Sequence, residues 1–128
     1  MRWALVTGAG QRLGRAVALG LAQAHWGVVV HYRGSAPEAE HIATLARAHS
    51  GGGVAVKADL SDPAERHALI THAMQAAGAP LLGLVNCAAL FEHDVIDTLS
   101  EDALGRHMAL NAYTPAVLAR EFAEALPD

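Results

Sequence analysis

The stretch Thr7-Gly8-Ala9-Gly10-Gln11-Arg12-Leu13-Gly14 decides the fold of this chain of 128 residues. An apolar, strand-like run (residues 3–6) precedes it, and a helix-like run (residues 16–24) follows it. Glycine lets the backbone approach a phosphate closely, and the N–H groups at a helix start point toward an anion. The stretch therefore predicts the first strand–turn–helix connection of a dinucleotide-binding unit. A tight turn that only packs a helix on a strand is the alternative.

Strand-like and helix-like runs alternate along the rest of the chain. We expect strands at residues 3–7, 27–32, 53–57 and 82–87, and helices at residues 12–24, 37–49, 63–77 and 101–126. The strands are continuous apolar runs, as in a parallel sheet with both faces covered. The alternation predicts one α/β domain over residues 1–128, a Rossmann-type doubly wound parallel sheet in three layers. The expected strand order is 3-2-1-4, with the later strands absent and the ligand crevice above strands 1 and 4.

Two of the expected helices begin with capping signals. Ser35-Ala36-Pro37-Glu38 and Asp62-Pro63-Ala64-Glu65 each place a short polar residue three positions before a glutamate. Both patterns predict capping boxes, the second with proline at the first helical position.

Composition and charge argue against several classes of function. The net charge of −4 gives no basic surface for nucleic acid, and no apolar run approaches the roughly 18 residues of a membrane-spanning helix. The single cysteine, Cys87, cannot form an internal disulfide, which favours a cytoplasmic protein. The eight histidines include no i,i+4 pair, so we predict no metal site.

The glycine-rich stretch carries a family resemblance. Thr7, Gly8 and Gly14 match T-G-x-x-x-G-x-G, the usual fingerprint of the short-chain dehydrogenases/reductases, and Arg12 replaces the middle glycine. The variant T-G-A-x-x-R-L-G resembles the pteridine reductase and dihydromonapterin reductase branch of that family. The resemblance implies that Arg12 points toward both cofactor phosphate and a bound pterin. It also implies that the cofactor lies against Gly8, Gly10, Arg12, Leu13 and Gly14.

The end of the second strand indicates which dinucleotide would bind. An NAD site usually has an acid there for the ribose hydroxyls, but this chain has none before Glu38. Arg33 and Ser35 instead offer a cation and a hydroxyl to a 2′-phosphate, which favours NADP(H). A solvated loop charge is the alternative for Arg33. The run from His31 to Ser35 resembles the NADPH-specific pteridine reductases, which implies cofactor contacts for His31, Tyr32, Arg33 and Ser35.

The third strand is followed by Asp59 and Leu60. In the family that it resembles, an acid and an apolar residue at this place bracket the adenine ring. An equally weighted reading is that Asp59 ends the strand and supports the turn at Ser61 and Asp62.

The fourth strand ends in a partial match to the family pattern N-N-A-G or N-N-A-S. Asn86 and Ala88 match it, and the resemblance implies that they line the nicotinamide ribose together with Ala89. Cys87 replaces the second asparagine, and we interpret it as a buried structural thiol rather than a reactive one, since no cation neighbours it in sequence. Phe91 resembles the aromatic residue that stacks on a pterin; an anchor in the core or loop is the alternative.

The last expected helix contains an asparagine on its apolar face. Leu104, Met108, Asn111, Pro115, Leu118 and Phe122 share one face, which should lie on the sheet. Pro115 has no N–H, so the carbonyl of Asn111 should lose its intrahelical partner and the helix should kink. In the family, the corresponding asparagine holds a water in a proton relay. From the residues alone, an amide that satisfies strand backbone is the alternative.

The resemblance covers the whole chain but only the first half of the family fold. The family's serine and Tyr-x-x-x-Lys are expected elsewhere, because Tyr113 is followed four positions later by Val117 and the only lysine is Lys57. We therefore expect the cofactor half of an NADPH-dependent reductase that acts on C=O or C=N, with a pterin-like substrate favoured. This chain alone should be inactive, and it should form a homo-oligomer through its last helix. A non-catalytic nucleotide-binding fragment and a ketoacyl-type carbonyl reductase are the alternatives.

Overall fold

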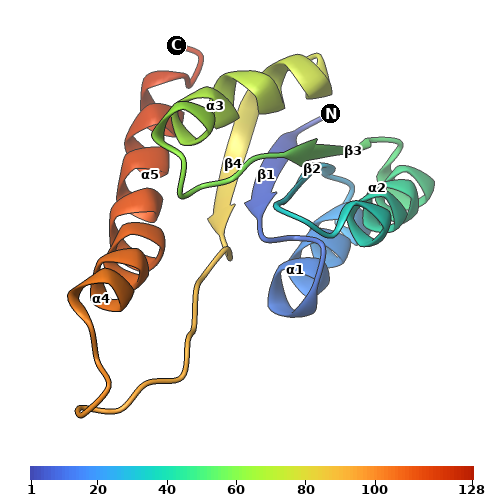
Figure 1. The fold of residues 1–128 in the computed structure, drawn as a ribbon. Coiled ribbons are helices and arrows are strands. Elements are labelled where there is room, and N and C mark those ends of the chain that lie inside the picture. Colours follow the sequence, from blue (N-terminus) through green and yellow to red (C-terminus); the bar gives the residue numbers. More distant parts are fainter.

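A computed structural model describes all residues from 1 to 128. Four parallel strands form one sheet in the order β3-β2-β1-β4, which confirms the predicted order (Figure 1). The strands are β1 (Trp3–Thr7), β2 (Gly27–Tyr32), β3 (Gly53–Lys57) and β4 (Leu81–Asn86). The helices are α1 (Arg12–Gln23), α2 (Ala36–Ser50), α3 (Pro63–Ala77), α4 (Glu101–Met108), the π-helical segment η1 (Ala109–Tyr113) and α5 (Thr114–Glu124).

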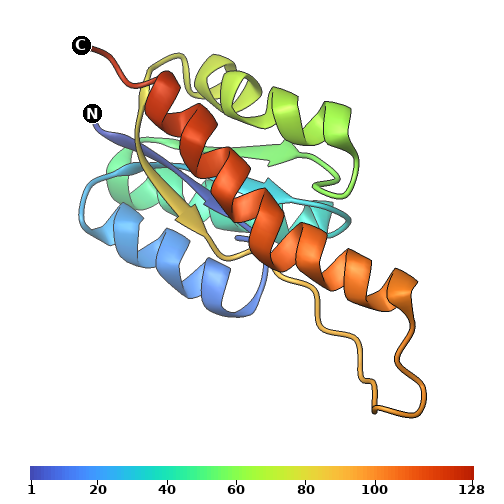
Figure 2. The same cartoon turned by 90° about the vertical axis from the view of Figure 1, so that its left-hand side faces the viewer.

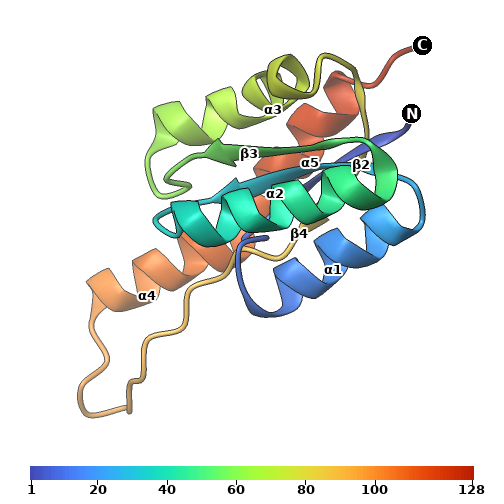
Figure 3. The ribbon, with the colours of Figure 1, turned by 90° about the vertical axis from the view of Figure 1, so that its right-hand side faces the viewer.

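The helices cover both faces of the sheet and make three layers. Helices α1 and α2 lie on one face, and α3 and α5 lie on the other (Figures 2 and 3). The chain reverses its winding after β3, so the carboxyl ends of β1 and β4 meet where the strand order changes. In a doubly wound sheet this is the position of the ligand crevice.

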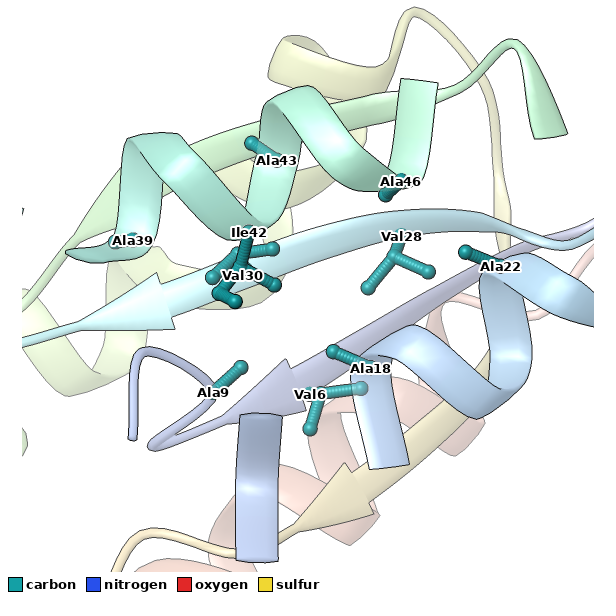
Figure 4. Close-up of a cluster of buried hydrophobic side chains, with 10 residues drawn as sticks. All are labelled: Val6, Ala9, Ala18, Ala22, Val28, Val30, Ala39, Ile42, Ala43 and Ala46. Atoms are coloured by element: carbon teal, nitrogen blue, oxygen red, sulfur yellow. The ribbon is translucent and has the colours of Figure 1, made fainter. Parts of the chain in front are cut away.

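Alanine dominates the core on the side of α1 and α2. Figure 4 shows ten buried side chains between these helices and the sheet, and six of them are alanine. Ala18 and Ala22 lie one helical turn apart on the buried face of α1. Because alanine is short, the helix backbones lie close to Val6, Val28 and Val30 of the sheet. The amino-terminal end of α1 is thereby brought against the end of β1.

The core on the opposite face contains larger side chains. Leu5 and Val29 from the sheet, Leu69 from α3 and Leu118 from α5 are all completely buried there. Phe122 packs against this cluster as well. The part of the predicted apolar helix face that includes Leu118 and Phe122 therefore lies on the sheet, as predicted.

The first part of the last helix differs from the prediction. Leu104 and Met108 were expected on the sheet, but both are exposed. The reason is visible in Figure 2: α4 extends past the sheet at the end of a long excursion of residues 87–100. The single helix predicted over residues 101–126 is instead divided by η1, which ends just before Pro115. Thr114 donates its hydroxyl to the carbonyl of Ala109 at 2.8 Å, within this irregular turn. A π-helical turn next to the proline takes the place of a simple kink.

One predicted capping box is wrong and the other is half formed. Ser35 precedes α2, but its side chain makes no capping hydrogen bond. The Asp62 carboxylate accepts from the Ala64 N–H at 2.9 Å, as an N-cap should. Glu65, however, accepts from the N–H of Asp59 at 3.2 Å. Glu65 thus closes the loop after β3 instead of the helix start.

Strand β4 pairs only with β1 and has an open edge.

None of the helices is both long and apolar enough to cross a membrane.

Candidate functional site

A cavity of about 440 Å³ lies at the carboxyl ends of all four strands. Most of the residues predicted for the cofactor line it: Gly8, Gly10, Arg12, Leu13, Gly14, His31, Tyr32, Arg33, Ser35, Asp59, Leu60, Ala88 and Ala89. Residues that were not predicted for the cofactor also line it: Gln11, Gly34, Ala58, Ser61, Cys87, Leu90 and Leu110. Most of the missed residues are immediate sequence neighbours of predicted ones, so extending each motif by one residue would have found them.

The glycine-rich turn is built so tightly that side chains are excluded at two positions. Gly8 has φ +61°, and a Cβ there would lie 2.9 Å from the Ala88 Cα. A Cβ on Gly14 would lie 2.1 Å from the Gly8 carbonyl oxygen, so only glycine lets α1 start against this turn. No side chain caps α1, and its first turn holds no acidic residue. The first amides of α1 can therefore receive an anion at the cavity wall.

Arg12 has a strained backbone at the entrance to α1. Its φ is +52°, in the left-handed region that costs a non-glycine residue about 1 kcal/mol. This conformation explains why the family pattern has glycine there. The arginine side chain lines the cavity despite that cost, which adds a cation beside the uncapped helix start.

Thr7 joins the two strands that flank the crevice. Its buried hydroxyl accepts hydrogen bonds from the N–H groups of Cys87 and Ala88, both at 3.0 Å. The end of β4 is thereby fixed next to the glycine-rich turn. Thr7 matches the family pattern in sequence, but its role in joining the strands was not predicted. Burial raises the pKa of the neighbouring Cys87 thiol, so the thiol stays protonated at neutral pH.

His31 lies underneath the turn and is 2% exposed. Its Nδ1 accepts from the Gly8 N–H at 3.0 Å, and its Nε2 lies 2.9 Å from the Ala58 carbonyl oxygen. Because Nδ1 accepts a hydrogen bond, the proton must be on Nε2. Burial lowers the pKa of this ring, and the Ala58 carbonyl opposes part of that effect. His31 is therefore a neutral bridge between the turn and the end of β3.

Polar side chains from three loops meet at the far end of the cavity. Arg33 Nε lies 3.8 Å from Asp59 Oδ1, and the arginine side chain is 71% exposed. Gln11 donates from Nε2 to the Ser35 hydroxyl at 3.1 Å. Hydrogen bonds from the Ser61 hydroxyl and backbone N–H lower the pKa of Asp59, and the charge of Arg33 lowers it slightly further. The structure thus contains the turn at Ser61 that was the alternative reading of Asp59, with Asp59 also at the cavity.

Three predicted site residues lie outside the cavity lining. Asn86 ends β4 and is exposed, and the Phe91 side chain is 85% exposed on the excursion after β4. Asn111 binds the backbone of Leu90 twice: its Oδ1 accepts from the Leu90 N–H, and its Nδ2 donates to the Leu90 carbonyl, each at 2.8 Å. The amide thus satisfies backbone just past the end of β4, close to the alternative reading, although Asn111 is exposed rather than buried.

Two further side chains fix the start of the same excursion. His107 Nε2 accepts from the Glu92 N–H at 3.0 Å, while Arg106 forms an ion pair with the Glu92 carboxylate at 2.7 Å. This pairing lowers the pKa of Glu92 and raises the pKa of Arg106. Neither residue was predicted, since the partners are 14 or 15 positions apart and share no motif.

The sheet order and the cavity at the carboxyl ends of the strands define an α/β domain of the Rossmann type. Comparison with protein families matches residues 2–128 to adh_short, the short chain dehydrogenases. A chloroplastic NADPH-dependent aldehyde reductase 2 from Arabidopsis thaliana is 34% identical over 98% of this chain and 50% of its own length. The chain belongs to the short-chain dehydrogenase family.

Solved structures agree with this assignment. The alternative dihydrofolate reductase FolM from Brucella suis, in complex with NADP, has a TM-score of 0.89 and 35% sequence identity. The match covers 98% of this chain and 50% of that one. A short chain dehydrogenase from Burkholderia cenocepacia with NADP has a TM-score of 0.92 at 28% identity, over 99% of this chain and 51% of that one. The chain spans about half the length of the relatives that it matches.

Proposed function

We propose that the cavity binds NADPH and that the chain is the cofactor half of a reductase that transfers hydride to a C=O or C=N bond. The fit is supported by an uncapped helix start, a turn without room for side chains, and adjacent cationic side chains. NADPH would supply the hydride. Gly8, Gly10, Arg12, Leu13 and Gly14 would hold the pyrophosphate, and Asp59 and Leu60 would bracket the adenine.

One observation supports NADPH rather than NADH as the cofactor. The end of β2 presents Arg33 and Ser35 to the cavity, with no acid between β2 and Glu38. Ser35 is held by Gln11, and Arg33 is free to exchange its 3.8 Å contact with Asp59 for a 2′-phosphate. Arginine binds phosphate through two parallel hydrogen bonds, which a ribose hydroxyl cannot match.

Arg33→Ala tests this choice. We expect NADPH affinity to fall by about tenfold and NADH affinity to change little, since only NADPH carries the 2′-phosphate. Isothermal titration of both cofactors against both proteins measures the effect. Arg120→Ala is the matched control, because Arg120 is on α5 and pairs only with Glu124. Equal losses for the two cofactors would contradict the role of Arg33.

The remaining residues would act on the reacting end of the cofactor. We propose that Ala88 and Ala89 let the nicotinamide ribose approach the backbone and that Asn86 supports the end of β4. The carbonyl of Asn111, which precedes Pro115 by four residues, would hold a water in the proton relay. Its side chain would keep Leu90 and the carbonyl at fixed positions through their two hydrogen bonds.

A pterin-like substrate remains the favoured proposal. Arg12 at the middle-glycine position supports it, as does the likeness to a structure described as an alternative dihydrofolate reductase. Phe91 would reach the substrate only if the excursion folds back over the cavity, because it is 85% exposed. NADPH oxidation by the full-length protein with dihydrobiopterin and with a ketoacyl thioester as substrates would separate this proposal from a ketoacyl-type reductase. Binding of NADPH without turnover of any carbonyl or imine would favour the non-catalytic alternative.

Self-association through the last helix is a further part of the proposal. Leu104 and Met108 on α4 and Tyr113 on η1 are all more than half exposed, which supports an interface on this side. Light scattering of the wild type and of a Leu104→Glu/Met108→Glu variant would test it, with a smaller mass expected for the variant. A cytoplasmic location stays a prediction.

A further inference from the structure

His31 accepts hydrogen bonds from two consecutive backbone amides of the glycine-rich turn. Its Nδ1 accepts from the Gly8 N–H, and its own carbonyl accepts from the Ala9 N–H, both at 3.0 Å. Its Nε2 donates to the Ala58 carbonyl at 2.9 Å. One residue of β2 therefore fixes the turn after β1 and the loop after β3. The side chain is buried beneath the turn at the cavity wall, where it supports the turn through these hydrogen bonds.

We propose that His31 is a positioning residue: its neutral ring, with the proton on Nε2, holds the glycine-rich turn in the shape that receives the dinucleotide. This inference rests on the proposed NADPH site. It adds an action through Gly8 to the cofactor contact that the resemblance implied for His31. Affinity for the cofactor should then depend on the protonation state of the His31 ring through the position of the turn.

The turn has little freedom to compensate for a lost hydrogen bond. Gly8 is held at φ +61°, and both Ala88 and Gly14 approach it so closely that no Cβ fits at either glycine. A protonated ring would carry a hydrogen on Nδ1, which would face the Gly8 N–H at a distance where two donors repel. The turn would have to move away from the ring. The amides of α1 that follow it would move as well.

The charged groups around His31 come from several elements. Three of them line the cavity: Arg12 at the start of α1, Arg33 after β2 and Asp59 after β3. Glu65 lies on α3 and accepts a hydrogen bond from the Asp59 N–H. None of them is a cause of the shift in the His31 pKa, which burial lowers and the Ala58 carbonyl partly restores. The ring is therefore neutral at pH 7 and becomes protonated only below its ordinary value of 6.5.

The sign of the pH effect follows from this shift. Well above pH 6.5 the ring is almost entirely neutral in both the folded and the unfolded protein, so affinity should not change through His31. As the pH falls below the lowered pKa of the folded protein, binding must displace a proton. The affinity should then fall by up to about tenfold per pH unit. The folded state is also destabilised over the interval between 6.5 and the lowered pKa, because the unfolded chain binds the proton more readily.

Two substitutions test the roles of the two ring nitrogens separately. In His31→Asn the amide oxygen can take the place of Nδ1 toward Gly8 and cannot titrate. In His31→Gln the longer side chain reaches toward Ala58 instead and leaves the Gly8 N–H without its acceptor. His72→Asn is the control, because His72 is exposed on α3 and has no hydrogen-bond partner. Thermal unfolding of each variant shows whether it is folded at each pH.

The experiment is a titration of NADP⁺ against these proteins between pH 5 and 8. Adenosine 2′-monophosphate, whose only phosphate is the 2′-monoester, is the ligand that reports the titration of the 2′-phosphate alone. We expect the wild type and His72→Asn to lose affinity at acid pH beyond the loss that the 2′-phosphate causes. His31→Asn should lose that excess and keep its affinity at pH 8, while His31→Gln should bind about fivefold more weakly at pH 8. A wild-type pH profile in His31→Asn, or wild-type affinity in His31→Gln, would overturn the inference.

A measurement without ligand keeps this result separate from the proposed function. Two-dimensional ¹⁵N NMR of the imidazole should show a proton on Nε2 of His31 at pH 7.5, and the Gly8 amide should exchange faster in His31→Gln than in the wild type. A proton on Nδ1 would overturn the inference directly. Failure of the wild type to bind NADP⁺ would instead overturn the proposed function, while the NMR result would still decide whether His31 holds the turn.

Discussion

The two ends of the crevice differ in how they are held. At the turn between β1 and α1, Thr7 and His31 are buried, and both accept hydrogen bonds from backbone amides far away in sequence. On the other side, the excursion of residues 87–100 and α4 extend from the sheet (Figures 2 and 3). Their contacts through Asn111, Arg106 and His107 are mostly exposed. Buried hydrogen bonds and close packing fix the cofactor turn and the first two residues of the excursion. The rest of the excursion depends on exposed hydrogen bonds and an ion pair, each of which contributes little to stability.

The largest effect is expected from Gly14→Ala in the buried turn. The new Cβ would lie 2.1 Å from the Gly8 carbonyl oxygen, so α1 must move away from the turn. We expect the free energy of unfolding to fall by about 4 kcal/mol, measured by urea titration. Gly20→Ala on the same helix is the control, because no atom lies within 4 Å of its Cβ; it should stabilise the protein by about 0.5–1 kcal/mol. Similar effects of the two substitutions would contradict the close packing of the turn.

A smaller effect is expected from Thr7→Val. Valine keeps the shape of the side chain but removes the oxygen that accepts from the Cys87 and Ala88 amides. The free energy of unfolding should fall by about 2 kcal/mol, and these two amides should exchange faster with deuterium. Thr7→Ser keeps the hydroxyl and should preserve the protection of both amides. Loss of that protection in the serine variant would mean that the hydroxyl is not the link between β1 and β4.

The smallest effect on stability is expected from Asn111→Ala on the exposed side. The substitution removes both hydrogen bonds to Leu90, yet water can replace them because the site is open. We expect less than about 1 kcal/mol of lost unfolding free energy, together with faster exchange of the Leu90 amide. A loss as large as that of Thr7→Val would show that the excursion is held as firmly as the turn.

The sequence predicted the sheet well because the signals there are local. Continuous apolar runs marked all four strands, and the Asp62–Pro63 step marked the start of α3 at the correct residue. The boundary of β4 was displaced by only one residue, since Leu81 is as apolar as the residues after it. Strand order followed from the alternation and the rules of crossover connections.

The contacts that shape the site were not predictable in the same way. Ser35 looked like a helix cap, but its hydroxyl is bound by Gln11, 24 residues earlier in sequence. His31 lines the cavity as predicted, but no sequence pattern indicated that its ring bonds to Gly8 and Ala58. The apolar spacing of Leu104 and Met108 could not reveal that α4 lies beyond the edge of the sheet. Each of these depends on which distant backbone group lies nearby in the folded protein.

We propose above all that the cavity recognises a 2′-phosphorylated dinucleotide. The most direct test is the ratio of the dissociation constants of NADH and NADPH for the wild-type protein, measured by isothermal titration at pH 8, where His31 is neutral. We expect NADPH to bind more tightly than NADH by at least about tenfold. Equal affinity for the two, or binding of neither, would contradict it.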